Sequence, residues 1–292
     1  MVTKLEKIWL DGKFVDWDNA NVHILTHALH YGTSVFEGIR SYEGKDGKAH
    51  IFKLKEHIER LFYSARMLNI KIKYSVDEII KATEELLEIN NIKACYIRPI
   101  VFLGDGPMGL TTTESPVRVS IIAWPWGVYL GDDAFEKGIK VTVCPYRRQI
   151  SELSKAKIGG TYYISVLSKR FAIDNGYDEA LMLDTEGNVA EGSGENIFMI
   201  KEGIISTPKL GAILPGITRA SVIEILKSKG LDVQERTISL DELKNADELF
   251  FTGTAAEMTP IVEIDGTKIS NGKVGEMTSS LIQDFFKMLK KV

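Results

Sequence analysis

The stretch SKAKIGGTYY, at residues 154–163, places Lys157 one residue before two glycines and a few residues before two tyrosines. The glycines allow another group to approach the backbone closely, and the tyrosine hydroxyls can hydrogen-bond to such a group. Burial favours the uncharged form of a lysine, which can then attack a carbonyl group as a free amine. Most lysines are ordinary surface residues, however, so Lys157 taken alone establishes no chemistry.

The composition is typical of a protein that folds in water. Apolar residues make up 44% of the chain and charged residues 26%, unlike the composition of disordered chains. The net charge of −4 and the lack of a block rich in Lys and Arg argue against a nucleic acid or an anionic membrane as partner. No apolar run reaches the roughly 20 residues of a membrane-spanning helix. Cys95 and Cys144 lie in apolar stretches, as buried thiols do in the cytoplasm, where we expect this protein.

A chain of 292 residues usually forms two domains. We expect a small α+β domain at 1–126, an interdomain loop at 127–134 and a larger domain at 135–292, with a cleft between the two domains. Hydrophobic periodicity and turn residues define the elements. The predicted helices are 54–68, 76–89, 161–175, 218–229 and 281–289, and the predicted strands are 8–10, 14–15, 36–42, 50–54, 94–103, 117–124, 139–144, 179–183, 196–200, 204–206, 232–238 and 248–251.

Three further motifs lie in the second half, and each also has an ordinary structural explanation. EGSGEN at 191–196 is an acidic, glycine-rich sequence before an apolar strand, as many plain turns are. LPGITR at 214–219 leads into a predicted helix whose first amides can bind phosphate, although helix capping alone explains these residues about as well. TGTAAE at 252–257 offers hydroxyl groups and amides to an anion.

Taken together, these motifs match the needs of one cofactor, pyridoxal phosphate. Its aldehyde requires an amine, its pyridine nitrogen requires an anion, and its phosphate requires amides, hydroxyl groups and an arginine. The chain can supply all of these groups. We expect no metal, because the five histidines and two cysteines do not show the spacing of a zinc site.

Seven motifs follow one another along nearly the whole chain: His27–Gly32, Phe36–Arg40, Tyr96–Pro99, Ala156–Gly160, Glu191–Asn196, Pro215–Arg219 and Gly253–Glu257. In this order they resemble the branched-chain amino acid aminotransferases, which are fold-type IV pyridoxal-phosphate enzymes, like D-amino acid aminotransferase and aminodeoxychorismate lyase. The resemblance implies a two-domain α+β or α/β protein similar to D-amino acid aminotransferase. Its N-terminal domain would be small and α+β, and its larger C-terminal domain would be mixed β with flanking helices.

The resemblance also implies how the cofactor is bound. Lys157 would bond to the cofactor aldehyde and carry the proton between the substrate Cα and the cofactor. Glu191 would pair with the pyridine nitrogen, and Tyr162 would hydrogen-bond to the phenolic oxygen. The phosphate would be held by Arg60, by the turn Gly216, Ile217 and Thr218, and by the hydroxyl group of Thr254. Lys155 stays open as an alternative nucleophile, because in an extended segment it would point to the same face as Lys157.

For the substrate, the resemblance implies an apolar pocket with polar groups at its edge. Its walls would include Phe36, Gly38, Trp126 and Tyr129, although core packing alone explains Phe36 and Trp126 about as well. Tyr31, Arg98 and Tyr129 would bind the γ-carboxylate of glutamate, and Tyr96 with the amides of Thr254 and Ala255 would bind the α-carboxylate. In this family the neighbouring subunit supplies Tyr31 and the loop 104–110, so the resemblance implies a homodimer or a higher homo-oligomer.

The expected activity is a reversible ping-pong transamination. The amino group of L-leucine, L-isoleucine or L-valine would pass to 2-oxoglutarate, which would give a branched 2-oxo acid and L-glutamate. A D-amino acid aminotransferase or a lyase of the same fold is the nearest alternative, and the segments 36–40 and 96–99 favour the branched-chain group. A non-catalytic cofactor-binding protein is a third hypothesis, disfavoured by the presence of both Lys157 and Glu191.

Overall fold

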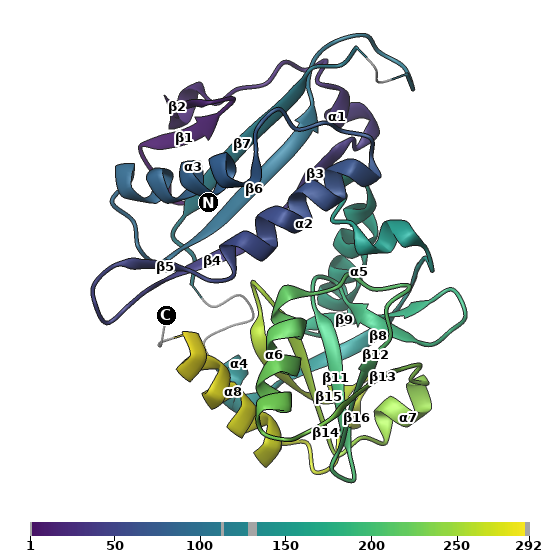
Figure 1. Cartoon of the computed structure of the whole chain (residues 1–292). Coiled ribbons are helices and arrows are strands. Elements are labelled where there is room, and N and C mark those ends of the chain that lie inside the picture. Colours follow the sequence, from purple (N-terminus) through teal and green to yellow (C-terminus); the bar gives the residue numbers. More distant parts are fainter. Residues whose placement is uncertain (1, 112–113, 128–132, 290–292) are drawn as a thin grey trace. The chain divides into compact units, whose positions relative to one another are not determined.

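The computed structural model describes residues 2–111, 114–127 and 133–289 (Figure 1). The chain forms two compact units. The first comprises Met1–Gly127, Ala156–Tyr162 and Lys290–Val292, and the second comprises Val128–Lys155 and Tyr163–Leu289. The segment that carries Lys157 therefore belongs to the first unit. The domain bounds expected from the sequence stay a prediction, since residues 128–132 lie outside the described ranges.

The first unit is built on one antiparallel sheet of seven strands in the order β2-β1-β7-β6-β4-β5, with β3 also paired to β6. The strands are β1 (Lys7–Leu10), β2 (Lys13–Asp16), β3 (Ser34–Phe36), β4 (Ile39–Glu43), β5 (Ala49–Ile51), β6 (Cys95–Leu103) and β7 (Val117–Trp124). The helices are α1 (His27–Tyr31), α2 (Leu54–Met67) and α3 (Val76–Ile89), besides short 3-10 turns at Trp17–Asn19 and Gly159–Thr161.

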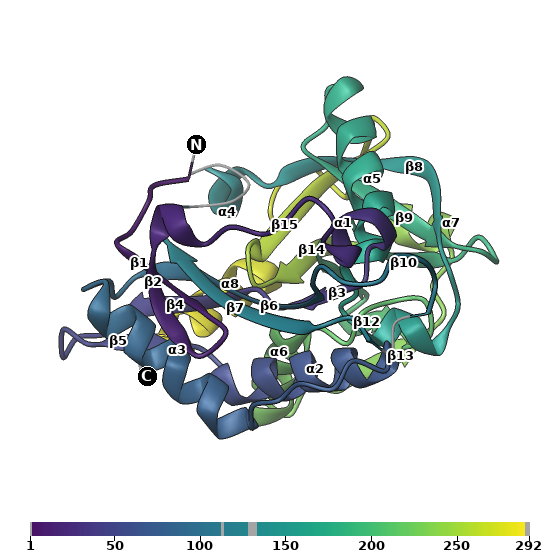
Figure 2. The ribbon, with the colours of Figure 1, turned by 90° about the horizontal axis from the view of Figure 1, so that it is seen from above.

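Helices α2 and α3 cover one face of this sheet, as both views show (Figures 1 and 2). The apolar stripe of α2 includes Ile58, Leu61 and Ala65, which are buried in the core of the unit. A capping box begins α3: the side chain of Ser75 accepts from the N–H of Glu78, and the Glu78 side chain accepts in return. Both helices lie where the 3.6-residue periodicity predicts them.

The strand predicted at 36–42 is interrupted at Glu37 and Gly38. Phe36 pairs with Ile100 and Ile39 pairs with Ile97, so the register against β6 continues through the interruption. The N–H of Glu37 still donates to the carbonyl of Pro99. Proline has no N–H to donate in return, so the ladder is divided into β3 and β4 at this point.

The second unit is built on a nine-stranded sheet in the order β10-β9-β8-β15-β14-β11-β12-β13, with β16 paired to β15. An additional pairing between β10 and β11 closes six of these strands, β8, β9, β10, β11, β14 and β15, into a ring. The sheet is mixed, because β8 runs parallel to β9 and β15 whereas the other ring pairs are antiparallel. The strands are β8 (Ile139–Arg148), β9 (Glu179–Asp184), β10 (Val189–Gly192), β11 (Asn196–Lys201), β12 (Ile204–Pro208), β13 (Val233–Arg236), β14 (Glu248–Gly253), β15 (Glu257–Ile264) and β16 (Thr267–Lys268).

Helices flank this mixed sheet, as predicted for the second half. They are α4 (Ala134–Lys137), α5 (Tyr162–Asp174), α6 (Ile217–Ser228), α7 (Leu240–Lys244) and α8 (Glu276–Leu289), with a 3-10 helix at Glu152–Lys155. In the second half the sequence missed β10, β15, β16, α4, α7 and five residues at the start of α8. In β15, Pro260 argues against a central strand. The structure accommodates it because the pairing with β8 begins only at Ile261. None of the helices in the described ranges has the length and apolar content that crossing a membrane requires.

Candidate active site

In the first unit, Lys157 lies in an aromatic environment. Its Nζ donates to the hydroxyl group of Tyr162 at 2.5 Å and lies 4.9 Å from the ring centre of Phe36. Its backbone is fixed as well, because its N–H donates to Oγ of Ser64 at 2.9 Å and its carbonyl accepts from the N–H of Phe36. The structure therefore brings together Lys157, Tyr162 and Phe36, three of the residues predicted from the sequence.

Lys155 has a different environment, and the assumption of an extended segment was wrong. Residues Glu152–Lys155 form a 3-10 helix, and Nζ of Lys155 pairs with the carboxylate of Glu152 at 2.7 Å. The hydroxyl group of Ser151 accepts from the N–H of Leu153, which favours this local turn. Lys157 is thus the lysine beside the predicted phenol.

The two glycines after Lys157 are required by the chain itself. A Cβ on Gly159 would lie 2.2 Å from Oγ of Ser34. Gly160 packs on Gly32, to whose carbonyl its N–H donates at 3.0 Å. The group that approaches these two glycines closely is therefore the chain around Gly32 and Ser34, at the end of α1 and the start of β3.

Arg60 belongs to a buried network with Glu37 and His57. Its Nε and Nη2 donate to the two carboxylate oxygens of Glu37 at 2.6 and 2.9 Å, and Nδ1 of His57 lies 2.8 Å from the same carboxylate. Burial favours a raised pKa for Glu37, but the charge and hydrogen bonds of Arg60 and the bond with His57 hold that pKa well below its usual value. Burial lowers the pKa of His57. A neutral His57 and an ionised Glu37 thus fix the orientation of the Arg60 guanidinium.

Arg98 lies among aromatic rings in the first unit. Its guanidinium carbon is 4.6 Å from the ring centre of Phe36 and 5.4 Å from that of Tyr96. Tyr96 contacts Trp126 edge-to-face at 4.4 Å between ring centres, and its hydroxyl group lies where a Cβ of Gly38 would be. In the part of the chain that the structure describes, Nε of Arg98 is buried without a hydrogen bond. Such an unsatisfied donor in an apolar surrounding suits a carboxylate that carries an apolar chain.

Two predicted substrate residues are not among these contacts. Tyr31 is 44% exposed on α1, where its ring packs against His27 at 4.5 Å between centres. Nε2 of His27 lies 2.7 Å from the carbonyl oxygen of Gly109, so α1 is attached to the loop 104–110. Tyr129 lies outside the described residues.

In the second unit, Glu191 is buried at the end of β10, where it forms an ion pair and accepts hydrogen bonds. Nε of Arg148 lies 2.9 Å from Oε1, and both Nδ2 of Asn196 and the N–H of Leu214 donate to Oε2 at 3.1 Å. These contacts fix the carboxylate in place and favour its ionised form. The turn between Glu191 and Asn196 is closed by the N–H of Gly192, which donates to the carbonyl of Glu195 at 2.7 Å.

The start of α6 is anchored to the same asparagine. Nδ2 of Asn196 also donates to the carbonyl of Leu214, and a Cβ on Gly216 would lie 2.0 Å from Oδ1 of Asn196. Gly216 is the N-cap of α6 and provides no capping side chain, so it leaves the first amides of the helix to another acceptor, and Thr218 in the first turn is buried. This arrangement suits an anion at the helix N-terminus.

The end of β14 adjoins this turn. Thr252 pairs with Asn196 across the strands, and its Oγ1 is buried without a hydrogen bond in the described ranges. A Cβ on Gly253 would lie 3.3 Å from the carbonyl oxygen of Gly194. Thr254 and Ala255 follow, both half-buried. The predicted residues of the second unit therefore gather at one end of β10, β11 and β14.

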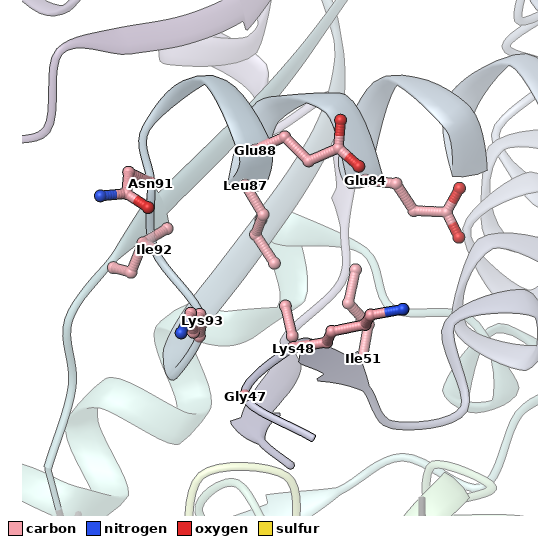
Figure 3. Close-up of a pocket in the computed structure, with 10 residues that line it drawn as sticks. Gly47, Lys48, Ile51, Glu84, Leu87, Glu88, Asn91, Ile92 and Lys93 are labelled. Atoms are coloured by element: carbon pink, nitrogen blue, oxygen red, sulfur yellow. The ribbon is translucent and has the colours of Figure 1, made fainter. Parts of the chain in front are cut away.

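A pocket elsewhere on the first unit contains none of these residues. It has a volume of about 610 Å³, and the α3 side chains Glu84, Leu87 and Glu88 face the hairpin residues Lys48 and Ile51 there (Figure 3). Its charged groups have both signs and lie at the surface, so the pocket shows no preference for one class of ligand.

Comparison with known proteins decides the family. A family model described as amino-transferase class IV matches residues 34–264. The branched-chain-amino-acid aminotransferase of Pseudomonas aeruginosa is 48% identical over 284 residues, which are 97% of this chain and 92% of that protein. The crystal structure of the Escherichia coli branched-chain amino acid aminotransferase matches with a TM-score of 0.96 at 40% identity and covers 99% of this chain and 96% of its own. The chain belongs to the branched-chain-amino-acid aminotransferases of class IV.

A third relative bears on the cofactor. The branched-chain amino acid aminotransferase of Thermobaculum terrenum, whose crystal structure is that of the PLP-form, matches with a TM-score of 0.91 at 31% identity over 98% of this chain and 94% of that one. The predicted family, fold type and cofactor are thus confirmed, and this aminotransferase uses pyridoxal phosphate. The groups present fit that cofactor: an amine beside a phenol in the first unit, and in the second a buried carboxylate and an uncapped helix N-terminus.

Sequence reasoning missed the partners that fix the aminotransferase site residues. Glu37 and His57 hold Arg60, and Arg148 and Asn196 hold Glu191. Some signals were available. His57 and Arg60 are three residues apart on one helix face, and Asn196 closes the motif that begins at Glu191. Nothing in the sequence pattern pointed from Arg148 to Glu191.

Proposed function

We propose that this aminotransferase moves the amino group of L-leucine, L-isoleucine or L-valine to 2-oxoglutarate in a reversible ping-pong reaction. The observation that carries the proposal is the position of Lys157, whose Nζ lies 2.5 Å from the Tyr162 hydroxyl group and against the Phe36 ring. The rings exclude water from one side of the amine, and the hydroxyl group orients it. When bound, pyridoxal phosphate supplies the aldehyde that takes up the amino group and the ring that withdraws electrons from the substrate Cα.

We assign the acid–base work to Lys157. As a free amine, its Nζ would remove the proton from the substrate Cα. It would then return a proton to the cofactor carbon C4′, which keeps the amino nitrogen when the oxo acid leaves. Tyr162 orients Nζ and hydrogen-bonds to the phenolic oxygen of the cofactor. Arg60, held by Glu37, binds the phosphate from the first unit. In the second unit, Glu191 binds the pyridine nitrogen, and the phosphate-binding groups are Gly216, Ile217, Thr218 and Thr254.

The aromatic residues of the first unit support the proposed substrate pocket. Phe36, Gly38 and Trp126 would contact the branched side chain, together with Tyr129. Arg98, whose Nε is buried without a hydrogen bond in the described ranges, would bind the γ-carboxylate of glutamate, with Tyr31 assisting. The α-carboxylate would bind to Tyr96 and to the amides of Thr254 and Ala255. One site would in this way accept an apolar chain and a carboxylate in turn.

We also propose a homodimer or a higher homo-oligomer in the cytoplasm. Apolar side chains are exposed before α1, on α1 and on the loop 104–110: Ile24 is 73% exposed, Leu29 60% and Leu110 86%. Such a cluster is costly in water and is typical of an interface. Cys95 and Cys144 are free, buried thiols, which suits a reducing compartment.

The proposal is tested by a half-reaction. The protein loaded with cofactor is mixed with L-leucine in the absence of 2-oxoglutarate, and the absorbance of the pyridoxal form should be replaced by that of the pyridoxamine form. Addition of 2-oxoglutarate should restore the first spectrum. D-Alanine serves as the comparison donor, and faster conversion with D-alanine than with L-leucine would overturn the assignment.

The nucleophile is tested separately. Borohydride reduction of the loaded protein followed by peptide mapping should find the label on Lys157. The variant Lys155→Ala should be labelled like the original protein, whereas Lys157→Ala should not be labelled. A label on Lys155 would contradict the proposed role of Lys157.

A further inference from the structure

Arg148 is the last residue of β8 and lies against Glu191. Its Nε forms an ion pair with Oε1 of Glu191 at 2.9 Å and donates to the carbonyl oxygen of Ala212 at 3.2 Å, and only 13% of its side chain is exposed. The side chain of Glu191 is 9% exposed. Among the groups that contact the Glu191 carboxylate, Nδ2 of Asn196 and the N–H of Leu214 are neutral donors. The Arg148 guanidinium adds a positive charge.

The other charged groups near Glu191 come from neighbouring strands and from α5. Burial, and then the charge of Glu179, raise the pKa of Glu195. Glu195 is therefore largely protonated at neutral pH and adds little negative charge near Glu191. Glu179 is paired with Lys169 of α5 at 2.9 Å. Arg148 is thus the cation that the structure places in contact with the Glu191 carboxylate.

A carboxylate beside a pyridine nitrogen shares one proton with it. The pair can be a pyridinium with a carboxylate, or a neutral pyridine with a carboxylic acid. Burial favours the neutral pair, because both charges lose their hydration. A guanidinium bonded to the carboxylate favours the charged pair, since it stabilises the ionised oxygen.

We propose that Arg148 is a positioning residue that keeps Glu191 ionised, so that the shared proton stays on the pyridine nitrogen of the cofactor. The proposal rests on the proposed role of Glu191. A protonated pyridine withdraws electrons more strongly than a neutral one, so Arg148 acts on the reaction through Glu191 without touching the substrate.

The neighbouring arginine provides a matched control. Arg147 differs from Arg148 by one position in the same strand, and its Nη1 donates to the carbonyl of Cys144 at 3.0 Å. A register shift in β8 lies between Val143 and Arg147, directly before this pair. Arg147 and Arg148 thus have the same charge and the same strand but different partners.

The experiment measures the protonation of the pyridine nitrogen directly. The protein is loaded with cofactor that carries ¹⁵N in the ring, and the ¹⁵N chemical shift is recorded for the original protein and for the variants Arg148→Gln, Arg148→Lys and Arg147→Gln. Arg148→Gln should move the signal toward the value of unprotonated pyridine and weaken cofactor binding by about tenfold, because the largely buried ion pair with Glu191 is lost. Arg148→Lys, which retains the charge, should keep more of the original shift, and Arg147→Gln should leave it unchanged.

Glu191→Gln separates this inference from the proposed function. If Glu191→Gln leaves the ¹⁵N signal unchanged, the proposed role of Glu191 fails. If Glu191→Gln moves the signal but Arg148→Gln does not, only the role of Arg148 fails. Combining Arg148→Gln with Glu191→Gln should give the signal of Glu191→Gln alone, and an additional displacement in the combined variant would show that Arg148 acts by another route. If Arg148→Gln does not fold, the comparison of Arg148→Lys with the original protein decides: a signal at the unprotonated value despite the retained charge would overturn the proposal.

Discussion

Glu37 has no exposed surface, and yet it is an ionised carboxylate inside an apolar core. Its charge is tolerated because Arg60 binds both oxygens and His57 lies at hydrogen-bond distance. Breaking such a pair leaves an uncompensated buried charge, which costs more than the intact pair contributes. The same holds at Glu191, which is held by Arg148. At both places a residue proposed to bind the cofactor is fixed by an opposite charge.

The first prediction concerns Glu37→Gln. Glutamine has the same shape but no charge, and its NH2 group, which replaces one carboxylate oxygen, cannot accept from Arg60, so we expect the free energy of unfolding to fall by about 3 kcal/mol in urea titrations. The control is Glu43→Gln, because Glu43 pairs with Lys93 at 3.1 Å at the surface, with side chains 54% and 44% exposed. An exposed pair contributes less than about 1 kcal/mol. Equal losses in the two variants would contradict the proposed effect of burial.

The second prediction concerns pH and Glu195. The pKa of this buried carboxyl group is raised from 4.5 to about 8, by burial first and then by the charge of Glu179. Between these two values the folded protein retains a proton that the unfolded chain releases. The contribution of Glu195 to stability is therefore most favourable below pH 4.5 and becomes less favourable as the pH rises toward 8. We expect Glu195→Gln to remove a dependence of up to about 1.4 kcal/mol per pH unit, measured by urea unfolding at about pH 5 and pH 7.5. Glu186→Gln, on an exposed turn, is the control, and equal slopes in the two variants would refute the assignment.

At the residue scale, the sequence identified several residues of the candidate site but not the residues that hold them. Lys157 and Glu191 stand in short motifs that can be recognised locally. Glu37 and Arg60 are 23 positions apart, and the fold alone brings them together. A pattern of polar and apolar residues predicts which face of an element is buried, but it carries no information about which charged groups meet across elements.

At the scale of elements, the amphipathic helices were the most predictable part. The expected helix 76–89 coincides with α3, and 54–68 extends one residue beyond α2. Local periodicity and capping determine such segments. The strands depended more on context. The ladder interruption at Pro99 and the position of Pro260 before the β8 pairing arise from neighbouring strands, so no local pattern could predict them.

The third prediction concerns the packing of the segment 156–162. In Gly159→Ala the new Cβ would lie 2.2 Å from Oγ of Ser34, so we expect a loss of about 1 to 3 kcal/mol in the free energy of unfolding from overpacking. Removing the obstructing side chain in the double variant Ser34→Gly with Gly159→Ala should restore part of this loss. Gly127→Ala is the control, because no atom of a non-adjacent residue within the described ranges lies within 4 Å of its added Cβ. A double variant no more stable than Gly159→Ala would show that the obstruction is elsewhere.

At the scale of the whole molecule, length and composition predicted two units, and motif order predicted the family. Neither predicted that the segment around Lys157 would group with the first unit. The chain enters that unit at Ala156 and leaves it after Tyr162. The contacts responsible are the bonds from Lys157 to Ser64 and Phe36 and from Gly160 to Gly32. These contacts join residues far apart in the sequence, and composition carries no information about them. A domain boundary predicted from composition therefore could not place this segment in the first unit.

The last prediction concerns assembly. Thr26 forms an isolated bridge with Asp105, and Nε2 of His27 lies 2.7 Å from the carbonyl oxygen of Gly109, so α1 and the loop 104–110 form one surface. Leu29 is 60% exposed on this surface. We expect Leu29→Glu to shift the protein toward the monomer in sedimentation velocity experiments, because a carboxylate in an apolar interface loses its hydration without gaining a partner. Ile89→Glu is the control, since Ile89 is also exposed, at 43%, but lies at the end of α3. If Leu29→Glu and Ile89→Glu sediment like the original protein, this surface is not the interface.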